Sequence, residues 1–462
     1  MLKASAGLTP PLGISYIAAY VKRNGFQVEI LDNNALNLDG NQFEEFFKKK
    51  DPLIVGFAMY LTTVNCVLDF ASIIKKIKPD IKIIVGGALA TNLYKDILKS
   101  ALIDVAVKGE GERTMSELIN AIKNGNDLSQ VKGIAYKEND RIRETAEREL
   151  VENIDEMPFP AYELLQMDKY HLSAPCSFTK NKNIGAIITS RGCPYSCSFC
   201  SNIFGKKIRY RSEKNVIAEI KYLKKTYNVK DFLFCDDTFT HDEDKAIRIC
   251  ELIVKNKLDI LWSCFSRADR GSEKLYKALY QAGCRSIFFG AESGSQKILD
   301  NLNKGITLND IKKSVALCKK HKLSSFCSFI LGSPEDDINT IEETIDFAKK
   351  LDPDYALFGL FHPAPGSKIF NDLQRKNVFH MDFYKTKWEN YFLFFSPRLL
   401  PFEVSSLSKK ELIKLQKKAF REFYFRPKKI VGFLLRIRSF HQTKQLLRGA
   451  FSLITFEFCK VK

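Results

Sequence analysis

Three cysteines in one short segment are the residues of this chain that most directly indicate chemistry. Cys193, Cys197 and Cys200 have three and two residues between them in the segment 189–201, TSRGCPYSCSFCS. This spacing lets one loop supply three thiolates to a cubic iron–sulfur cluster and leaves the fourth iron open, whereas electron-transfer ferredoxins use four thiolates. The segment therefore predicts a catalytic [4Fe-4S] site. Unligated buried cysteines, or a zinc ion that would want a fourth ligand nearby, are the alternatives.

The residues on either side of the cysteines predict a strand and a helix. An apolar run, 184–189, precedes them, and a helical pattern near 213–225 follows. This context and the Cys-x-x-x-Cys-x-x-Cys spacing, with Phe199 before the last cysteine, resemble the signature of radical S-adenosylmethionine (SAM) enzymes. The resemblance implies that SAM completes the open iron. One electron from the reduced cluster would then release a 5′-deoxyadenosyl radical, which removes hydrogen from an unreactive C–H bond.

From residue 184 onward the chain alternates short apolar runs with helical patterns. The expected strands are 184–190, 231–235, 260–265, 286–291, 325–331 and 355–361. Such alternation predicts parallel strands joined by helices. Six units resemble the partial (β/α)6 barrel of radical SAM enzymes, whose active site faces the carboxyl ends of the strands. The cysteine loop follows the first of these strands and should lie at that rim.

Polar residues and a glycine follow the expected strands at the same rim. They are Asp236, Asp237, Arg267, Glu292 and Gly332. The resemblance implies that one Asp of the pair faces the SAM amino group, that Glu292 accepts ribose hydroxyls, and that Gly332 lets the backbone approach adenine. Arg267 would balance a carboxylate or bind substrate, and Phe199 completes the predicted SAM set. Taken alone, each residue has an alternative role in a turn or a helix cap.

The first part of the chain also alternates strands and helices. The expected strands are 28–31, 53–57, 81–85 and 104–107, with helices at 11–24 and 67–77. This α/β pattern predicts a doubly wound, flavodoxin- or Rossmann-like parallel sheet. Ligands of such sheets bind at loops beyond the carboxyl ends of the strands. The candidate residues there are Thr62, Thr63, Gly86, Gly87, Gly109, Glu110 and Gly111.

The order of three short motifs in this first part resembles the cobalamin-binding domain that precedes many radical SAM cores. They are PPLGISYIAAY at 10–20, VGG at 85–87 and GEGE at 109–112. The resemblance implies that the candidate loops bind cobalamin; a docking domain that binds nothing is the alternative. Relatives usually open with a strand before the first motif, so we expect a truncated start or a sheet that lacks one strand. No histidine precedes His171, so this domain has no histidine to offer as a lower cobalt ligand.

Length and composition suggest the organisation of the whole chain. We expect a cobalamin-binding domain at 1–140, a linker at 141–180, a radical SAM core at 181–400 and a helical basic region at 401–462. A β-hairpin near 133–143 is expected where the first domain meets the linker. The 12 cysteines are scattered and no secretory signal is evident, which favours a reducing cytoplasm. No apolar run reaches the length of a membrane span.

The C-terminal region carries much of the positive charge. The formal net charge is +18, and residues 401–462 contribute 15 Lys and Arg against 4 Asp and Glu. A nucleic-acid enzyme would spread such charge around its catalytic domain, so no nucleic-acid partner is expected. The tail is helical and amphipathic in pattern. It predicts either peripheral contact with an anionic membrane at its inner face or a helix packed across the barrel opening.

Together these features predict a cobalamin-dependent radical SAM methyltransferase. The cofactors are a [4Fe-4S] cluster, SAM and cobalamin, with an external one-electron donor such as flavodoxin or ferredoxin. The substrate is a small molecule, lipid-like if the tail meets a membrane, and is not identified by the sequence. A radical oxidative cyclase or rearrangement enzyme is the second hypothesis, and a non-catalytic redox or cobalamin sensor is a third. A methylthiotransferase is disfavoured because only Cys66 and Cys176 precede the motif.

Overall fold

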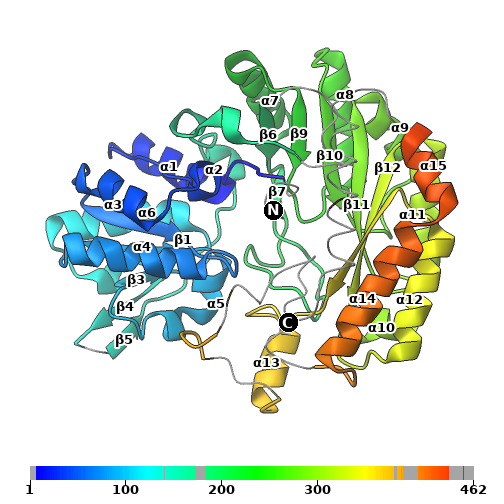
Figure 1. The fold of residues 1–462 in the computed structure, drawn as a ribbon. Coiled ribbons are helices and arrows are strands. Elements are labelled where there is room, and N and C mark those ends of the chain that lie inside the picture. Colours follow the sequence, from blue (N-terminus) through cyan, green and yellow to red (C-terminus); the bar gives the residue numbers. More distant parts are fainter. Residues whose placement is uncertain are drawn as a thin grey trace.

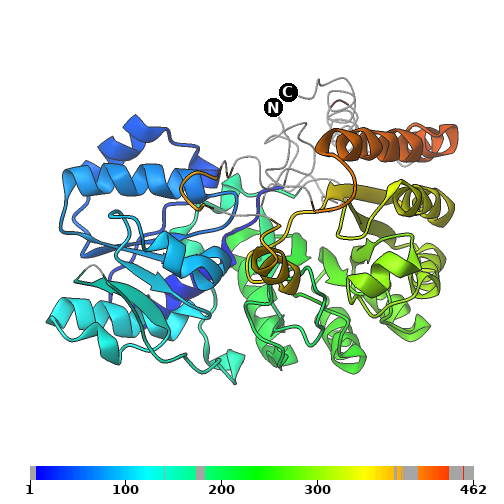
Figure 2. The ribbon, with the colours of Figure 1, turned by 90° about the horizontal axis from the view of Figure 1, so that it is seen from below.

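The structure is a computed structural model in which two sheets stand side by side, each covered by helices (Figure 1). It describes residues 7–139, 141–172, 183–378, 382–386, 388, 404–435 and 451. Figure 2 shows the same two units from below, with the N-terminal unit on the left and the larger sheet on the right. The alternation of strands and helices in the sequence is therefore realised as an α/β fold.

The N-terminal sheet is mixed. Its strands are β1 (Ile54–Ala58), β2 (Lys82–Gly86), β3 (Val105–Val107), β4 (Ile134–Glu138) and β5 (Arg141–Glu144), in that spatial order. The first three are parallel, and β4 and β5 form an antiparallel hairpin at one edge. This confirms the predicted hairpin, and it carries the sheet to Glu144, past the expected boundary at residue 140.

Helices cover both faces of this sheet. One face packs against α3 (Gly40–Lys48), α4 (Val64–Ile77) and α5 (Ala88–Ile97), and the other against α6 (Gly111–Asn124), which contacts α1 (Leu12–Arg23). A short helix, α2 (Asn33–Leu36), joins α1 to α3. Local sequence sets the helix ends: Asp39 and Gln42 form a capping box before α3, and Gly125 ends α6 with φ 66°.

The strand expected at 28–31 is not formed. A strand needs a neighbour to take its backbone hydrogen bonds, and no described strand pairs with this segment. The spatial order of β1 to β5 follows the chain, β1 to β3 are parallel and helices lie on both faces, so the predicted α/β domain with a parallel sheet is confirmed. The apolar pattern of residues 28–31 was not enough to make a strand without a partner.

The second sheet confirms the six predicted strands. It contains β6 (Ile184–Ile187), β9 (Asp231–Phe234), β10 (Leu261–Ser266), β11 (Cys284–Glu292), β12 (Ser324–Leu331) and β13 (Tyr355–Leu360). All are parallel, in the order β13-β12-β11-β10-β9-β6, so β6 and β13 are open edges among the described strands. The helices that follow them are α7 (Glu213–Tyr227), α8 (Glu243–Lys255), α9 (Glu273–Gln281), α10 (Gln296–Asn301), α11 (Leu308–Lys320) and α12 (Ile338–Leu351).

A small hairpin and the connecting segments lie between the two sheets. Strands β7 (Ser190–Arg191) and β8 (Arg209–Tyr210) pair antiparallel, and the chain between them is the cysteine loop, which occupies the centre of Figure 1. Short 3-10 turns occur at Leu128–Gln130, Ile154–Glu156, Tyr162–Leu164 and Met167–Lys169. The predicted cluster loop thus lies where both domains can reach it.

The C-terminal helices return to both units. Helix α13 (Lys368–Arg375) places Phe370 in the core of the N-terminal unit. Helix α14 (Lys409–Tyr424) packs on β13 and α12, and α15 (Pro427–Leu435) follows. This favours the packed-helix alternative for the first part of the basic tail; residues 436–450 and 452–462 lie outside the described part. None of the described helices combines the length and apolar character needed to cross a bilayer.

Candidate functional site between the two sheets

Local hydrogen bonds shape the cysteine loop. The amide of Cys193 donates to Gly205 O at 3.1 Å, and that of Cys200 donates to Cys197 O at 3.2 Å. The side chain of Asn202 donates to Cys193 O at 2.7 Å. The loop therefore folds back on itself, which brings cysteines at both of its ends together.

The cysteine side chains form one electrostatic group. Burial raises the pKa of the Cys193 thiol, and the charges of Asp237 and Cys197 add to this effect. Burial, Cys197 and Asp237 likewise raise the pKa of Cys200 to about 11. The disfavoured ionisation of Cys193 and Cys200 suits a site that gains its charge balance from bound iron. Among the described residues, no group of three His, Cys, Asp or Glu side chains is arranged to hold a single metal ion.

Arg267 lies against the cysteine loop. Its Nη1 is 3.8 Å from Cys197 Sγ, and its guanidinium carbon is 3.6 Å from the centre of the Tyr195 ring. Asp269 accepts a hydrogen bond from Nε at 3.0 Å, and Lys304 O accepts one from Nη2 at 2.8 Å. These contacts hold the guanidinium against the cysteine loop, and the prediction that Arg267 balances a carboxylate or binds substrate stays a prediction.

Asp236 anchors the segment that leads into the cysteine loop. Its Oδ1 accepts hydrogen bonds from Thr189 N at 3.0 Å, Thr189 Oγ1 at 2.8 Å and Ser190 Oγ at 2.6 Å. Its Oδ2 is buried and has no hydrogen-bond partner in the described structure. Burial raises the pKa of Asp236 to about 6 despite these bonds. Asp236 is thus a buried link between β9 and β6.

Asp237 is the member of the pair that faces the thiols. Its side chain is exposed, and its charge acts on both Cys193 and Cys200. The surrounding protein nevertheless raises the pKa of Asp237 by desolvation. An accessible carboxylate beside the cysteines fits the SAM amino group expected there, and this separates the two neighbours that the sequence left equivalent.

Glu292 forms a buried ion pair at the end of β11. Lys304 Nζ donates to Glu292 Oε1 at 2.6 Å, and the same ammonium lies 5.7 Å from the centre of the Phe199 ring. Glu292 has φ 59°, and the strand register shifts between Gly290 and Glu292. A Cβ atom at Gly290 would lie 2.2 Å from Glu292 Oε1, so glycine makes room for the pair. Backbone strain of this kind is typical of functional sites.

Gly332 serves helix packing. It has φ 82°, and a Cβ atom there would lie 2.7 Å from a methyl carbon of Leu412 in α14. Its amide donates to Asp336 Oδ2 at 3.0 Å. Leu412 fills the space left by the missing side chain, and the predicted approach of the Gly332 backbone to adenine stays a prediction.

The predicted cobalamin loops meet at one edge of the N-terminal sheet. Thr62 and Thr63 follow β1, Gly86 ends β2 and Gly87 follows it, and Gly109 follows β3. Because these strands are parallel, their carboxyl ends share that edge. Thr62 and Gly109 are exposed, and a Cβ atom at Gly109 would meet no atom within 4 Å. This open, glycine-lined edge fits a large flat ligand such as a corrinoid.

Glu110 and Gly111 do not belong to this open edge. Glu110 is buried in ion pairs with Arg191 and Arg209 of the cysteine hairpin. A Cβ atom at Gly111 would lie 2.8 Å from Ile17 Cδ1, so this glycine permits the close packing of α6 on α1. These contacts serve ion pairing and helix packing, and the predicted contact of both residues with cobalamin stays a prediction.

Sequence reasoning missed four residues of this centre: Tyr195, Lys304, Arg191 and Arg209. Tyr195 and Arg191 lie within or next to the cysteine motif, which was a usable signal. Lys304 follows α10 in a polar turn, where a lysine is ordinarily solvent-exposed. Only its 7% exposure and its contact with Glu292 mark it as part of the site.

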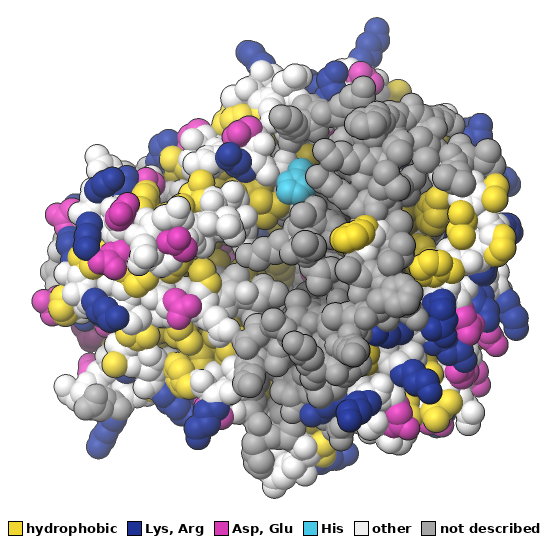
Figure 3. All heavy atoms as spheres, in the orientation of Figure 1, with side chains coloured by type: hydrophobic (Ala, Val, Ile, Leu, Met, Phe, Trp, Pro, Cys, Tyr) yellow, Lys and Arg dark blue, Asp and Glu magenta, His cyan; other side chains and the backbone are white. Residues whose placement is uncertain are grey.

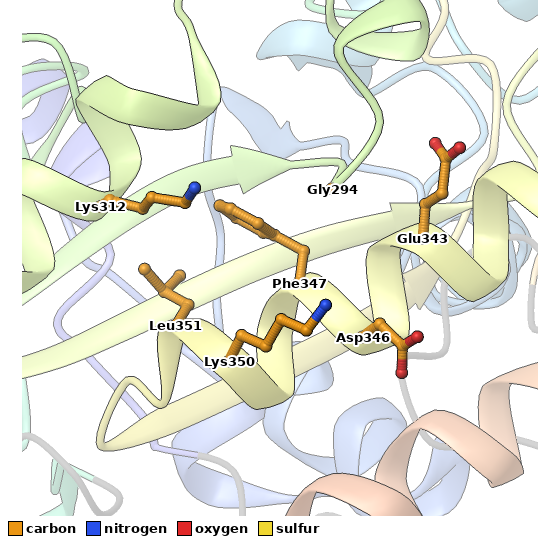
Figure 4. A pocket seen from close by; sticks show the side chains of 7 residues that line it. All are labelled: Gly294, Lys312, Glu343, Asp346, Phe347, Lys350 and Leu351. Atoms are coloured by element: carbon orange, nitrogen blue, oxygen red, sulfur yellow. The ribbon is translucent and has the colours of Figure 1, made fainter.

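Two cavities among the described residues lie outside this centre. One, of about 400 Å³, opens on the outer helices; Figure 4 shows Lys312 reaching toward Phe347 of α12, with Glu343 and Asp346 along the same helix. The other, of about 180 Å³, lies beside Ser198 between α10 and α13. Neither contains a cysteine or an acid of the predicted SAM set.

Comparisons with known proteins match both halves of the chain. The family described as "B12 binding domain" matches residues 1–119, and "Radical SAM superfamily" matches residues 187–348. An uncharacterized methyltransferase of Pyrococcus horikoshii is 35% identical, over 97% of this chain and 95% of its own length. The anaerobic magnesium-protoporphyrin IX monomethyl ester cyclase of Rubrivivax gelatinosus is 32% identical, over 82% of this chain and 69% of its own.

Solved structures share the fold. The radical SAM methyltransferase TsrM from Kitasatospora setae, with cobalamin and a [4Fe-4S] cluster bound, aligns with a TM-score of 0.67 at 20% identity, covering 80% of this chain and 72% of TsrM. The cobalamin-dependent radical SAM enzyme OxsB aligns with a TM-score of 0.72 at 18% identity, covering 97% and 70%. With the cysteine loop between a glycine-edged sheet and a six-stranded parallel sheet, the chain belongs to the cobalamin-binding radical SAM enzymes.

Proposed function

We propose that this protein is a cobalamin-dependent radical SAM methyltransferase that acts on an unactivated carbon or phosphorus centre of a small-molecule or lipid-like substrate. The observation that carries the proposal is the position of the cysteine loop, between the open glycine edge of the N-terminal sheet and the carboxyl ends of the second sheet. This position would let one substrate reach both cofactors, as methyl transfer to a substrate radical requires.

When bound, the cluster would supply the electron for the reductive cleavage of SAM, and cobalamin would supply the methyl group. The side chains position the reactants. Asp237 is the acceptor for the SAM amino group, and the Glu292–Lys304 pair lies beside the cysteine loop for the ribose. Arg267 and Tyr195 hold Cys197 in place.

Named relatives support the transfer of methyl groups. A cytidylyl-2-hydroxyethylphosphonate methyltransferase of Streptomyces wedmorensis is 26% identical over 80% of this chain, and a hopanoid C-3 methylase of Methylococcus capsulatus is 24% identical over 79%. TsrM has been solved with tryptophan as substrate. These substrates differ widely, which is why the substrate class of this chain is proposed only as small or lipid-like.

Anaerobic assays test the proposal. Protein reconstituted with iron and sulfide should form 5′-deoxyadenosine from SAM and dithionite, and Cys197→Ala should form none. With methyl-deuterated SAM, the deuterium label should appear in the substrate. This transfer should require a corrinoid. Turnover that forms a new ring or double bond without incorporated label would support the cyclase hypothesis instead, and absence of 5′-deoxyadenosine from cluster-loaded wild type would support a sensor.

We also propose an external electron donor and a peripheral membrane contact. A flavodoxin or ferredoxin would reduce the cluster, so each should replace dithionite in the same assay. For the membrane, α15 exposes Ile430 and Val431, 44% and 52% accessible, next to Lys428. Ile430→Asp with Val431→Asp should reduce co-sedimentation with anionic vesicles. Equal partitioning of the variant and the wild type would remove the membrane contact.

A further inference from the structure

Four buried charges lie at the neck of the cysteine loop, where strands β7 and β8 bring its two ends together. Arg191 and Arg209 belong to the hairpin β7–β8, whereas Glu110 and Glu112 belong to the N-terminal unit. The side chains of Glu110, Arg191 and Arg209 are at most 3% exposed and that of Glu112 is 6% exposed. Charges buried this deeply persist in proteins only when they are paired and hydrogen-bonded.

Glu110 is bonded to both ends of the loop. Its Oε1 accepts from Arg191 Nη1 at 3.0 Å and from Arg209 Nη1 at 2.9 Å, and its Oε2 accepts from Arg209 Nη1 at 2.9 Å. The amide of Val151 also donates to Oε2 at 2.8 Å. Glu112 adds a bond of 2.6 Å from Arg191 Nη2. Burial acts to raise the pKa of Glu110, but the bonds from Arg209 and the charge of Arg191 outweigh it and lower the pKa.

These four charged side chains connect the two ends of the cysteine loop to the N-terminal unit, and we call them the clasp. Arg191 and Arg209 are direct partners in the β7–β8 register, so two guanidinium groups emerge side by side. All three cysteines lie on the chain between them. Like charges opposite one another destabilise a strand pair, and Glu110 and Glu112 together neutralise both arginines. The neck is also sterically tight, because a Cβ atom at Gly192 would lie 2.4 Å from Lys207 O.

We propose that Glu110 and Glu112 are positioning residues for the iron–sulfur cluster, which close the neck of the cysteine loop and attach it to the N-terminal domain. The inference rests on the assignment of the cluster to Cys193, Cys197 and Cys200. Under this proposal the two acids of the GEGE motif act on the iron–sulfur cluster. They nevertheless follow β3, whose carboxyl end lies at the predicted cobalamin-binding edge of the N-terminal sheet. Residues that orient metal ligands from outside affect metal affinity by about 10–100-fold.

The test compares Glu110→Gln with wild type and a matched control. Glu117→Gln changes an exposed acid on the same helix, α6, whose partner Arg148 is outside the clasp. Each protein is reconstituted with iron and sulfide, and iron retention against a chelator and the electron paramagnetic resonance (EPR) spectrum of the reduced cluster are recorded. Affinity for hydroxocobalamin is measured by visible spectroscopy. We expect Glu110→Gln to weaken iron retention about tenfold or more and to change the EPR spectrum, with unchanged corrinoid affinity, and Glu117→Gln to match wild type.

Other outcomes overturn the inference. Weakened corrinoid binding with normal iron retention would make Glu110 a cobalamin contact, and wild-type behaviour in both assays would leave the clasp without a role. If circular dichroism shows that Glu110→Gln is unfolded, Glu112→Gln, which loses a single bond, decides by the same two readouts. A wild-type protein that assembles no cluster would instead refute the cofactor assignment, a result independent of any difference among variants.

Discussion

At the scale of single residues, the cysteine loop is surrounded by charges with distinct tasks. Arg267 contacts a cysteine sulfur, Asp237 faces the thiols, and Asp236 is buried behind them. Hydrogen bonds to cluster sulfurs and local charge are among the features that set the reduction potential of a cluster. Replacing one of these side chains should therefore change a measurable property that replacing its neighbour does not.

Arg267→Gln should lower the reduction potential of the cluster. The variant loses the N–H group 3.8 Å from Cys197 Sγ and a positive charge, both of which favour the more negative, reduced cluster. We expect a shift of the order of tens of millivolts, measured by EPR-monitored redox titration. Arg270→Gln is the control, because Arg270 donates to the Tyr195 hydroxyl at 2.7 Å and has no described contact with a cysteine sulfur. Equal shifts in the two variants would contradict a specific role of Arg267.

Asp236→Asn should remove a pH dependence of stability. The pKa of Asp236 is about 6 in the folded state against an ordinary value of 3.8, so the folded protein holds this proton more tightly. The stability contribution is therefore fully present below the ordinary pKa and is lost as the pH rises toward 6. The wild type should lose of the order of 2 kcal/mol through this group, whereas the variant should not. Urea midpoints at pH 4.5 and pH 7 measure the difference; an identical pH effect in both proteins would contradict it.

Asp237→Asn should weaken the binding of SAM and leave unchanged the pH dependence of stability that Asp236 causes. We expect weaker SAM binding to the cluster-loaded protein, by about 2 kcal/mol for the loss of a charged hydrogen bond. The SAM-induced change in the EPR spectrum, titrated with SAM, gives the affinity. If Asp236→Asn weakens SAM binding as much as Asp237→Asn does, the division of labour between the two acids is wrong.

At the scale of elements, α14 covers one edge of the second sheet. It lies along the edge strand β13, where Phe420 packs edge-to-face on Phe358 with ring centres 5.4 Å apart. The side chain of Gln416 donates to Phe358 O at 2.7 Å, and the Tyr424 hydroxyl donates to Ala356 O at 2.7 Å. An edge strand with free backbone groups invites pairing with other chains, and this helix covers it.

Phe420→Ala should cost about 3–5 kcal/mol of stability, as is usual when a large aromatic side chain is removed from a core. Phe420 is 3% exposed, whereas Lys414 on the same helix is exposed, so Lys414→Ala is the control. Urea unfolding followed by circular dichroism measures both. A loss below 1 kcal/mol for Phe420→Ala would mean that α14 does not pack on β13 in solution.

At the scale of the whole molecule, the two units share their cores. Leu12 and Tyr16 of α1 belong to the apolar cluster of the second sheet, while Phe370 and Leu373 of α13 belong to that of the N-terminal sheet. Figure 3 shows acidic and basic side chains interspersed over the described surface of both units. The units are thus joined by apolar packing and by the buried clasp at Glu110.

Phe370→Ala should therefore destabilise the N-terminal unit, although residue 370 is far along the chain. Phe370 is 2% exposed, and its removal should cost about 3–5 kcal/mol. We expect lower thermal stability and weaker hydroxocobalamin binding, and Arg375→Ala, on the exposed face of the same helix, should leave both unchanged. Unaltered corrinoid binding in a clearly destabilised Phe370→Ala protein would show that the two units unfold independently.

Much of the centre was predictable from local pattern. The spacing of Cys193, Cys197 and Cys200 indicated the cluster loop, and the apolar runs of the second sheet indicated its six strands, because both signals depend on residues close in sequence. Residues 28–31 show the limit of such signals. Their pattern is that of a strand, but a strand also requires a hydrogen-bonded neighbour, and no described strand pairs with them.

The sequence by itself determined which chemistry this protein carries, since thiolate spacing and strand periodicity are encoded over a few residues. Only the tertiary structure decided the tasks of individual side chains: that Asp237 faces the thiols while Asp236 is buried, that Glu110 binds the cysteine hairpin, and that Leu412 fills the space at Gly332. The physical reason is that burial and pairing depend on partners many residues away. Glu110 and Arg209, for example, are 99 positions apart.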